Sequence, residues 1–592
     1  MENKVFSKSE KFKSEYSCAV VRVGELTPIE GSDFLAKTLV FGTQIVVRKD
    51  QVSEGDIMIY ASNETQLDET FLSLNNLFEI GCREKNANAD DVNAIMSEYE
   101  PYKERADVIR SDAKRLKDSI NSMTKKASKI NKDIKKKENE IGKCESQESR
   151  DAILHEIGTL KEKADELLKK ATSKTTVYAN MKKEISDIVK SGEHIVAEAK
   201  KKVGFFNKYG RVRCITLKNT PSFGFLFKPE SLFKYDDTVT MEDVNAYVGE
   251  EFDTVNGKLF VKAFVPPVKE TPTMGSKTNK AQKKLDRFDR LVANEFFFHY
   301  DTAQLQKYIN YIKPVDNVAI SVKIHGTSIV IAKIHVKNEI RLPFLKRIWN
   351  KFVDKTRFLK SLRFVDYTIG YGPVYSSRKT IKNRYINEGV TKGYYGTDVW
   401  SEYGDIIYPY LEEGMTVYGE IFGYETGSQK MIQKFYDYGC NKGENKIMFY
   451  RITTTKQDGT KTEWNVSDVH EWTLGLIDRM KNDENDNYRK IHPIDILYHG
   501  EFDKLYPDMP VSDLWHENVL AKMKDDKEHF GMEQNEPLCK NEVPREGICL
   551  RIDDDKMLEC FKLKTVSFAL KEAVAMDSGE VDIEMMDNYA DN

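Results

Sequence analysis

The sequence predicts a multidomain α+β protein in which a small β-domain is interrupted by a long helical hairpin and is followed by a larger mixed α/β domain. Three observations lead to this class. The chain has 592 residues, which is too many for one hydrophobic core. Short runs of alternating apolar and polar residues, typical of strands, come before about residue 85 and return after about residue 204. Between them, apolar residues recur at helical spacing, with no aromatic residue from Lys103 to Val177.

The N-terminal β-domain is predicted from three apolar runs that are separated by Pro28, Gly31 and Gly55. Strand character returns at Arg211–Leu217 and at Gly224–Phe227. The simplest arrangement is one discontinuous domain, residues 1–85 and 204–265, with the helical segment inserted in a loop. Insertions are tolerated where two chain ends already lie close together. The three runs are Cys18–Val23, Leu39–Val47 and Asp56–Tyr60.

The inserted segment, residues 86–203, is predicted to be an antiparallel coiled-coil hairpin. Apolar residues recur every three, four or seven positions, and this 3.5-residue repeat favours a coiled coil. Gly142 to Ser149 supplies the break, and each arm would reach roughly 60 Å. Residues 101–200 hold 24 Lys and Arg against 18 Asp and Glu, so the arm is either a solvated surface or a contact for nucleic acid or a protein partner. The repeat comprises Ile109, Leu116, Ile120, Met123, Ala127, Ile130, Ile134, Ile141, Ile153, Ile157, Leu160, Ala164, Leu167, Ala171, Tyr178, Met181, Ile185 and Ile188.

The C-terminal half begins with a Pro-, Thr- and Lys-rich linker, residues 266–290, and continues as a mixed α/β domain over 291–573. An acidic tail, 574–592, ends the chain. Within the domain, Leu342–Phe364 is rich in basic and aromatic residues. It is either a helix packed on the core with a solvated basic face or a surface that faces nucleic acid.

Composition excludes several classes of protein. With 40% apolar and 31% charged residues, the chain is typical of a globular protein, and no run approaches the roughly 18 apolar residues that span a bilayer. Residues 1–13 lack the apolar stretch of a signal peptide, so we expect a cytoplasmic location and no membrane partner. The eight cysteines contain no C-x-x-C pair, which favours neither disulfides nor zinc. A net charge of −4 decides little, because charge is unevenly distributed.

A series of short boxes in the C-terminal half carries the chemistry. The first is a lysine-x-histidine-glycine box, Lys323 to Gly326, between two apolar runs. The later boxes follow it in order. They are Ser376-Ser377-Arg378-Lys379, Gly419-Glu420-Ile421-Phe422-Gly423, Met448-Phe449-Tyr450-Arg451-Ile452, Arg545-Glu546-Gly547 and Phe561-Lys562-Leu563-Lys564.

This ordered series resembles the nucleotidyltransferase motifs of ATP-dependent polynucleotide ligases and mRNA capping enzymes, over roughly residues 291–570. The first box, with His325 in place of the usual Asp, is similar to the RNA ligase 2 family, as are the Glu420 box and Ile496–Phe502. Leu26–Ile29 and Gln44–Val47 look like the module that precedes the catalytic domain in a bacterial RNA ligase class. The resemblance implies an N-terminal OB-like β-barrel and a mixed α/β nucleotidyltransferase (ATP-grasp-like adenylyltransferase) domain; the hairpin has no counterpart.

The residue types suit covalent nucleotidyl transfer. Lys323 must attack phosphorus as a free amine, whereas an unperturbed lysine with a pKa of about 10.4 is neutral in only about one molecule in 2,500 at pH 7, a deficit of about 4.6 kcal/mol. Neighbouring cations reduce that deficit because they disfavour a further positive charge. Lys562 and Lys564 are alternate residues of one strand, so both side chains can leave the same face. We expect them to supply these cations and to grip the α-phosphate.

The resemblance implies a role for each remaining residue. Arg378 contacts the nucleotide and the 5′-phosphate of the acceptor, and His325 assists the later steps. Glu420 accepts from the ribose and, with Glu546, binds a divalent metal, Mg²⁺ or Mn²⁺. Phe449 or Tyr450 stacks on adenine.

One position departs from the family pattern. Many relatives carry Glu before the lysine, where this chain has Val322, so the choice of ATP over GTP must rest on other groups.

The implied function is an ATP-dependent RNA ligase that joins a 3′-hydroxyl to a 5′-phosphate through lysyl-AMP and adenylylated RNA. We predict that its substrate is a nick in duplex RNA or in an RNA/DNA hybrid, because an OB module and a long arm suit a continuous double helix. The rival interpretations are a capping guanylyltransferase, a DNA ligase, and a scaffold that binds nucleic acid without catalysis.

Overall fold

The computed structural model describes residues 4–8, 16–142, 146–265, 289–299, 302–354, 362–384, 398–456, 459–554 and 559–577. The predicted tail therefore lies mostly outside the described residues, as does nearly all of the predicted linker. The chain divides into two compact units. The first unit comprises Met1–Thr65, Val212–Phe227 and Asn245–Asn592, and the second comprises Gln66–Arg211 and Lys228–Val244. Among the described helices, none is both long enough and apolar enough to cross a bilayer.

The N-terminal part of the first unit is built of short antiparallel strands. One sheet has the order β10-β6-β2-β11 and joins residues from both sides of the interruption, because Phe225 pairs with Ala61 and Phe252 pairs with Cys18. A second sheet has the order β3-β4-β5, and the two sheets share a core that includes Val21, Ile45 and Met58. The predicted OB-like barrel stays a prediction. The strands are β1 (Phe6–Ser7), β2 (Cys18–Arg22), β3 (Thr27–Pro28), β4 (Leu35–Val40), β5 (Thr43–Arg48), β6 (Ile57–Ala61), β8 (Ile215–Leu217), β9 (Thr220–Ser222), β10 (Phe225–Phe227), β11 (Glu251–Phe252), β12 (Thr254–Val255), β13 (Lys258–Leu259) and β14 (Val261–Ala263).

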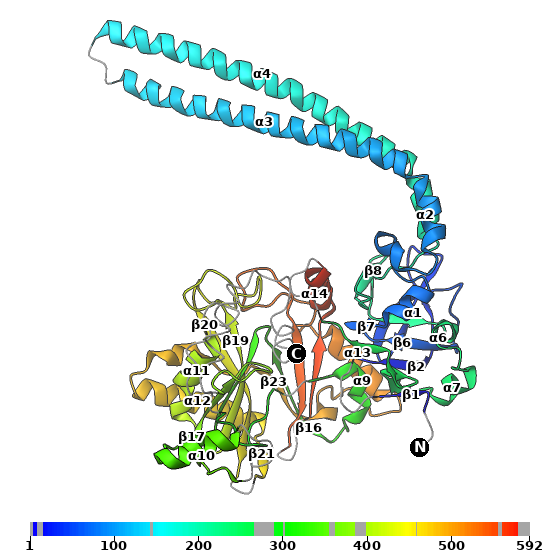
Figure 1. Ribbon diagram of the computed structural model, residues 1–592, viewed down its shortest axis with the longest axis vertical. Helices are drawn as coiled ribbons and strands as arrows, with labels where there is room; N and C mark the ends of the chain where they lie inside the picture. The colour runs from blue at the N-terminus through cyan, green and yellow to red at the C-terminus, as the bar shows by residue number, and fades with distance from the viewer. Residues whose placement is uncertain are drawn as a thin grey trace. The chain divides into compact units, whose positions relative to one another are not determined.

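The second unit contains two long helices, α3 (Glu100–Ile141) and α4 (Gln147–Ser191), that run side by side (Figure 1). They are antiparallel, since Arg105 pairs with Glu184 near one end and Glu138 pairs with Lys161 near the other. The most buried residues are mainly alanines at seven-residue spacing. On α3 they are Ala106, Ala113, Ala127 and Ile134, and on α4 Ile157, Ala164, Ala171 and Ile188. The unit also holds α1 (Glu69–Leu74), α2 (Ala89–Ser97), α5 (Glu193–Lys200) and α6 (Glu230–Tyr235).

Six of these eight residues belong to the predicted repeat, and only Ala106 and Ala113 were not predicted. A pair of helices packs most closely where the facing side chains are small, so the alanines are covered while Ile109, Leu116 and Ile120 are only half-buried at the edge of the contact. The predicted helical hairpin is confirmed, as is the α+β class. The structure extends this unit beyond residues 86–203, to Gln66 and Arg211.

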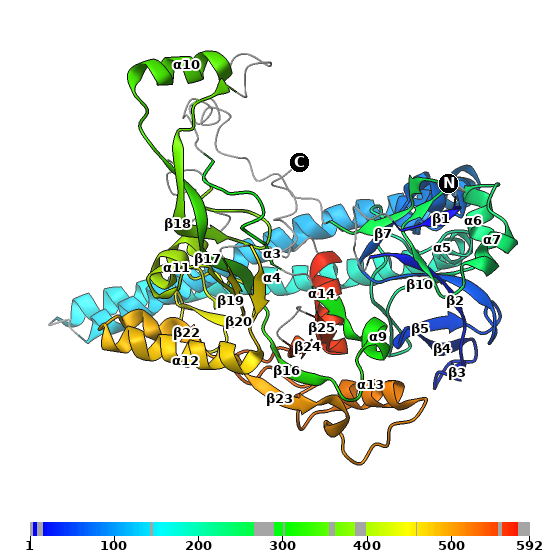
Figure 2. The same ribbon diagram turned by 90° about the horizontal axis from the view of Figure 1, so that it is seen from below.

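The C-terminal part of the first unit contains two sheets that face each other across a shared core (Figure 2). The five-stranded sheet has the order β15-β25-β24-β16-β23 and the six-stranded sheet has the order β18-β17-β19-β20-β21, with β22 beside β20. The strands are β15 (Ala303–Gln304), β16 (Asn317–Lys323), β17 (Thr327–Glu339), β18 (Tyr367–Ser376), β19 (Met415–Gly423), β20 (Asn445–Thr455), β21 (Lys461–Glu463), β22 (Ile491–His492), β23 (Ile496–Glu501), β24 (Gly547–Ile552) and β25 (Glu559–Lys564).

Helices cover the outer faces of these two sheets. α11 (Val399–Ile407) and α12 (Val466–Asn482) bury Trp400, Tyr403 and Leu476 against the six-stranded sheet. α9 (Leu305–Tyr308) and α13 (Trp515–Asp525) pack on the five-stranded sheet through residues such as Trp515 and Leu520. α14 (Val566–Asp577) continues past the predicted domain boundary at residue 573, because Ala573 and Met576 are buried. The outer faces are therefore closed by helices and the inner faces meet.

The predicted basic segment forms α10 (Phe344–Asp354), which follows β17 and precedes β18. Figure 2 shows it at the far end of these two strands. Among its residues only Asn350 and Val353 are buried. The alternative of a helix packed on the core is therefore wrong for most of its apolar residues, which are exposed, and holds only at Val353.

Candidate active site

The lysine box lies where the chain passes from one sheet to the other. Lys323 is the last residue of β16, opposite Gly547 of β24, and Thr327 begins β17, opposite Ile421 of β19. Only Ile324, His325 and Gly326 make the crossing.

Gly326 is required at this crossing, because a Cβ atom there would lie 2.3 Å from the carbonyl oxygen of Ile421. The side chain of Gln433 fixes the turn by donating from Nε2 to the carbonyl oxygen of Gly326 at 2.8 Å. Lys323 and His325 are therefore held at the junction of the two sheets.

A cavity of about 180 Å³ opens beside this junction and is lined from both sheets. Every predicted site residue except Phe449 lines it. The predicted residues are Lys323, His325, Arg378, Glu420, Tyr450, Glu546, Lys562 and Lys564; the others include Tyr16, His299, Thr302, Tyr418, Arg451, Arg551 and Glu572. Boxes that lie up to about 240 residues apart in the sequence thus meet around one cavity.

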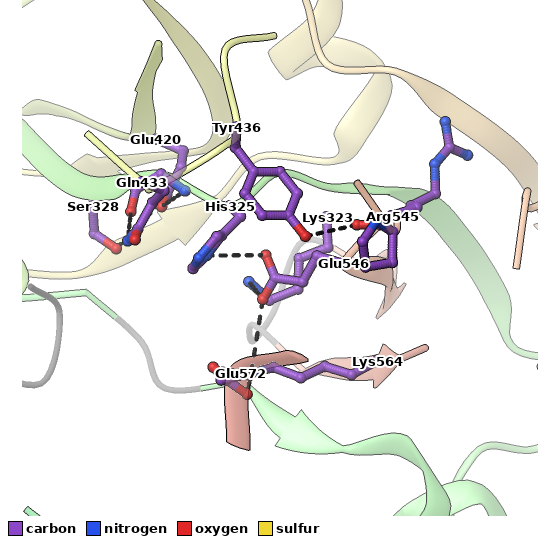
Figure 3. Close-up of polar contacts among 12 residues, drawn as sticks. Lys323, His325, Ser328, Glu420, Gln433, Tyr436, Arg545, Glu546, Lys564 and Glu572 are labelled. Carbon is purple, nitrogen blue, oxygen red and sulfur yellow. Dashed lines mark hydrogen bonds and ion pairs between the residues drawn. The ribbon is translucent and has the colours of Figure 1, made fainter. Parts of the chain in front are cut away.

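A row of alternating charges runs along one wall of the cavity (Figure 3). The ammonium of Lys323 lies 2.8 Å from Glu546 Oε1, and the same oxygen lies 3.9 Å from Lys564 Nζ. Lys564 in turn bonds Glu572 of α14 at 2.9 Å. Because Glu546 is almost fully buried, with a side chain 3% exposed, its charge is compensated mainly by these lysines.

The row shifts the pKa values of its members. Burial alone would lower the pKa of Lys564, but the carboxylates of Glu572 and Glu546 outweigh it and raise that pKa above the usual range. Burial would raise the pKa of Glu572, but the positive charge of Lys564 lowers it below the usual value. Both groups are therefore ionised at neutral pH.

The partner of Lys323 differs from the sequence-based expectation. That expectation held that neighbouring lysines would disfavour the ammonium form of Lys323. Lys564 does lie beside the same carboxylate, but Lys323 itself contacts Glu546 directly. A carboxylate at this distance stabilises the ammonium. The contact must open, and a proton must leave, before Lys323 can act as a nucleophile.

His325 is held from several directions. Its ring packs edge-on against Tyr436 and against Phe568, with ring centroids 5.1 Å apart in both pairs. Its Nδ1 lies 3.8 Å from Glu546 Oε2, and its backbone N–H donates to Tyr438 Oη at 2.7 Å. Burial raises the pKa of Tyr438 well above its usual value, so this hydroxyl remains neutral. The ring therefore has a fixed position beside Glu546.

Glu420 braces the turn as well as lining the cavity. Its Oε1 accepts from the backbone N–H of Gly326 at 3.1 Å, and its Oε2 accepts from Ser328 Oγ at 3.3 Å. Both oxygens thus have protein donors, although a carboxylate retains further lone pairs for a ligand.

Glu546 is the residue that best fits a divalent metal. Its Oε2 is buried and has no hydrogen-bond partner among the described residues. Within the part of the chain that the structure describes, no three His, Cys, Asp or Glu side chains gather as a complete metal cage. Mg²⁺ needs none, because it is commonly held by one or two carboxylates together with waters and substrate phosphates.

A bulge in β20 decides between the two candidate aromatic residues. Tyr418 pairs with Arg451 and Gly419 pairs with Phe449, so Tyr450 is skipped in the ladder. Phe449 points into the core under α12, where its ring meets Trp472. Tyr450 and Arg451 both line the cavity. Of the two aromatic residues, only Tyr450 is placed to meet a ligand.

The lysines of β25 alternate as predicted. Lys562 and Lys564 line the cavity, whereas Phe561 and Leu563, which alternate with them, are buried in the core of the five-stranded sheet. Arg378 lies two residues beyond the end of β18 and also lines the cavity.

Several residues of the site were not predicted. Glu572, Gln433, Tyr436 and Tyr438 lie outside every box, and each contributes a contact described above. For Glu572, the sequence signal is its position: it is a carboxylate about two turns into the helix that follows Lys564. The others come from a loop with no periodic pattern.

Comparisons with known proteins give little help. No known family model matches this sequence, and no curated protein matches it. Among solved structures, a lysine-to-alanine variant of Naegleria gruberi RNA ligase with ATP and Mn aligns with a TM-score of 0.42 and 12% identity, over 94% of this chain and 97% of that chain. The same ligase with PPi aligns with a TM-score of 0.42 and 13% identity, over 94% of this chain and 99% of that chain. A glutamate-to-alanine variant with AMP and Mn aligns with a TM-score of 0.41 and 12% identity, over the same shares of the two chains. A TM-score below 0.5 does not establish a shared fold.

Proposed function

We propose that this protein is an ATP-dependent RNA ligase that works through a covalent nucleotide on Lys323. The observation that carries the proposal is the single cavity where Lys323 meets cations suited to phosphates and carboxylates suited to a metal and a ribose. The cations are Arg378, Lys562 and Lys564, and the carboxylates are Glu420 and Glu546.

In the first step, the amine of Lys323 attacks the α-phosphorus of ATP. A phosphorus–nitrogen bond forms, the bond to the β-phosphate oxygen breaks, and pyrophosphate leaves. Lys562 and Lys564 face the phosphates, since both line the cavity from one face of β25. Their fixed charges stabilise the charge that develops on the phosphate oxygens. Tyr450 stacks on adenine and Glu420 accepts from the ribose.

In the later steps, the RNA 5′-phosphate takes AMP from Lys323, which gives a 5′-5′ pyrophosphate link. The 3′-hydroxyl of the other RNA end then attacks that phosphate, a phosphodiester forms, and AMP leaves. Arg378 binds the 5′-phosphate. His325, held beside Glu546, is close enough to assist these steps.

A divalent cation, Mg²⁺ or Mn²⁺, would be held by Glu546, with Glu420 as a second candidate. When bound, such an ion neutralises phosphate charge and polarises the phosphoryl oxygens.

The substrate that we propose is a nick in duplex RNA or in an RNA/DNA hybrid. His325 supports RNA over DNA, through the resemblance of its box to the RNA ligase 2 family. The helical hairpin is proposed as a contact for nucleic acid or a protein partner, and the N-terminal strands as an OB-like module. The proposed location is the cytoplasm.

The covalent step is tested with labelled nucleotide. We expect label from α-³²P-ATP, but not from GTP, to remain on the protein through a denaturing gel. Lys323→Ala and Lys323→Arg should abolish the signal, because neither offers an amine that can attack. Lys337→Ala, on β17 and outside the cavity lining, is the matched control and should label normally. Label from GTP alone would favour the capping guanylyltransferase instead.

The joining reaction is tested with four substrates: nicked duplex RNA, a nicked RNA/DNA hybrid, nicked duplex DNA and single-stranded RNA. We expect the two nicked RNA substrates to be sealed fastest. Faster sealing of nicked DNA would make the protein a DNA ligase. Labelling without joining of any substrate would refute the ligase assignment while leaving the covalent step intact.

A further inference from the structure

The helix α10 carries a continuous apolar face that the described part of the chain leaves uncovered. Phe344 and Leu345 are 66% and 78% exposed, far more than large apolar residues usually are in a folded chain. Ile348, Trp349 and Phe352 are also exposed. Phe344, Ile348 and Phe352 are four residues apart, and so are Leu345 and Trp349. These two adjacent rows lie on one side of the helix.

This orientation is fixed by contacts of Asn350, Val353 and the indole N–H of Trp349. The Asn350 amide donates to the carbonyl oxygen of Phe364 at 2.8 Å and accepts from the N–H of Phe364 at 2.9 Å. The indole N–H of Trp349 donates to the carbonyl oxygen of Leu362 at 3.0 Å. Val353 is completely buried beneath the helix. The helix is thus docked by a narrow side that includes Asn350 and Val353, and its larger apolar side chains are turned outward.

Further exposed apolar residues follow α10 in the sequence. Leu362 and Val365, between α10 and β18, and Ile369, near the start of β18, are all exposed. The largest uncovered apolar patches of a protein often mark interaction sites. The helix α10 lies at the far end of the β17–β18 pair (Figure 2), and none of these exposed residues lines the cavity.

Positive charge surrounds the apolar face. Lys346 lies over the ring of Phe364 and Arg347 over the ring of Phe344, at 4.9 and 5.9 Å from the ring centroids. Lys351 lies on the same helix. Among the described residues, no ion pair forms at these three side chains. Arg363 differs, because Asp354 and Asp366 neutralise it.

We propose that α10 is a membrane-surface helix that binds anionic lipid. Helices of this class combine a strongly apolar face bearing Trp, Phe and Leu with a flank of Lys and Arg. They lie in the plane of the interface, with the apolar side chains among the acyl chains and the cations among the headgroups. At 11 residues α10 is about 16 Å long, too short to span a bilayer. The sequence-based expectation of no membrane partner rested on the lack of a spanning run and of a signal peptide. A helix that lies on the membrane surface needs neither.

The aliphatic residues favour lipid over RNA as the occupant. Proteins bind single-stranded nucleic acid with cations along the backbone and with flat rings that stack on bases. Leu345, Val365 and Ile369, among the more exposed members of the surface, can do neither. The acyl region of a bilayer accepts aliphatic and aromatic side chains equally well, and anionic headgroups complement Lys346, Arg347 and Lys351. The proposal does not depend on the proposed ligase function.

The test is co-sedimentation of the full-length protein with vesicles. One set contains phosphatidylcholine with about one third phosphatidylserine, and the other contains phosphatidylcholine alone. We expect binding to the anionic set that weakens with added salt. Leu345→Glu with Phe352→Glu should lower the affinity at least about tenfold, because two side chains that would enter the acyl region become charged. Lys346→Glu with Lys351→Glu should lower it on anionic vesicles only.

Leu474→Glu, at another exposed leucine on α12, is the matched control and should bind like the wild type. Labelling of each variant by ATP and its far-UV circular dichroism report whether the rest of the chain is intact. Equal binding by the wild type and the Leu345/Phe352 variant would overturn the proposal. Two other results for the Leu345/Phe352 variant would also overturn it. One is a loss of affinity for labelled nicked RNA with unchanged affinity for vesicles, which would make RNA the partner. The other is a changed sedimentation coefficient with unchanged affinity for vesicles, which would make a second copy of the chain the partner.

Discussion

The charge row Lys323–Glu546–Lys564–Glu572 holds the cavity lysines in place before any nucleotide arrives. Glu546 is shared by two ammonium groups, at 2.8 and 3.9 Å, and Lys564 also pairs with Glu572 at 2.9 Å. Preorganised charge of this kind stabilises a developing anion without reorganisation at the moment of reaction. Its cost is that Lys323 begins as a paired ammonium.

The outer pair of this row should contribute to stability in a pH-dependent way. The pKa of Glu572 is lowered in the folded protein, so its contribution is present above the unfolded carboxyl value of about 4.3 and is lost as the pH falls through the folded pKa. The pKa of Lys564 is raised, so its contribution is present below the unfolded lysine value of about 10.4 and is lost as the pH rises through the folded pKa. Between these limits the pair is fully formed.

Glu572→Gln should therefore lower the free energy of unfolding by about 1 to 3 kcal/mol at pH 7. Urea denaturation of the wild type and the variant measures this difference. It should shrink as the pH falls from about 4.3 through the lowered folded pKa of Glu572, because first the unfolded chain and then the folded protein take up the proton. Glu471→Gln, at an exposed position of α12, is the control and should leave the free energy of unfolding unchanged. A difference that is the same at pH 7 and in acid would contradict the electrostatic explanation.

The two aromatic residues of β20 should separate binding from folding. Tyr450→Ala removes a ring from the cavity and should weaken ATP binding roughly tenfold, because stacking on a base is worth about 1 to 3 kcal/mol. Phe449→Ala removes a core ring and should lower the free energy of unfolding by about 3 to 5 kcal/mol. Equilibrium nucleotide binding and thermal denaturation of both variants are the measurements. If Phe449→Ala alone weakened binding, the assignment of Tyr450 would be wrong.

At the scale of elements, short local patterns predicted a good part of the site. A lysine box between apolar runs, a carboxylate in an apolar strand and alternating lysines each report a strand and the face from which a side chain leaves. Together with the family resemblance, which supplied the roles of Glu420 and Glu546, these patterns predicted five residues that line one cavity: Lys323, Glu420, Glu546, Lys562 and Lys564. The bulge at Tyr450 broke the two-residue period that such patterns assume, so the sequence could not choose between Phe449 and Tyr450.

Contacts made by loops and by helix ends were beyond prediction. Tyr438 accepts from the backbone of His325, which is 113 residues away in the chain, and no periodic signal connects them. The apolar side chains of α10 were expected to face the core or nucleic acid. Periodicity shows that a helix has an apolar face, but not what covers it.

The crossing between the sheets leaves no room for a side chain at Gly326. Gly326→Ala should lower the free energy of unfolding by about 1 to 3 kcal/mol, because its Cβ would lie 2.3 Å from the carbonyl oxygen of Ile421. The displaced turn carries Lys323 and His325, so labelling by ATP should fall more than stability does. Thermal denaturation and labelling are the two measurements.

Gly158→Ala is the opposite case. Gly158 lies within α4, and a Cβ there would meet nothing within 4 Å. This change should raise stability by about 0.5 to 1 kcal/mol and leave labelling unchanged. Equal effects of the two glycine substitutions would show that the turn is not sterically constrained.

At the scale of the whole molecule, every residue that lines the cavity belongs to the first unit, whereas the hairpin belongs to the second. The two ends of the hairpin meet at its base. A Cβ on Gly192 would lie 2.7 Å from the ring of Tyr99. The gap that would remain without α3 and α4 is therefore short.

Replacing residues 100–191 by a short Gly-Ser linker should leave labelling by ATP unchanged. The helices α2 and α5, which contact each other at the base, remain in this variant. Circular dichroism should show the loss of two long helices, and labelling should match the wild type. Loss of labelling in a variant that still folds would mean that the hairpin contributes to the nucleotide site.

The seven-residue spacing of the buried alanines has a consequence for how the length of the arm can change. Removing or adding seven residues, or a multiple of seven, in each helix keeps the heptad register, while other numbers shift it. One such step moves the tip by about 10 Å. The reach of the hairpin is thus quantised, and it can be lengthened or shortened by insertion or deletion with no new packing solution and no change at the cavity.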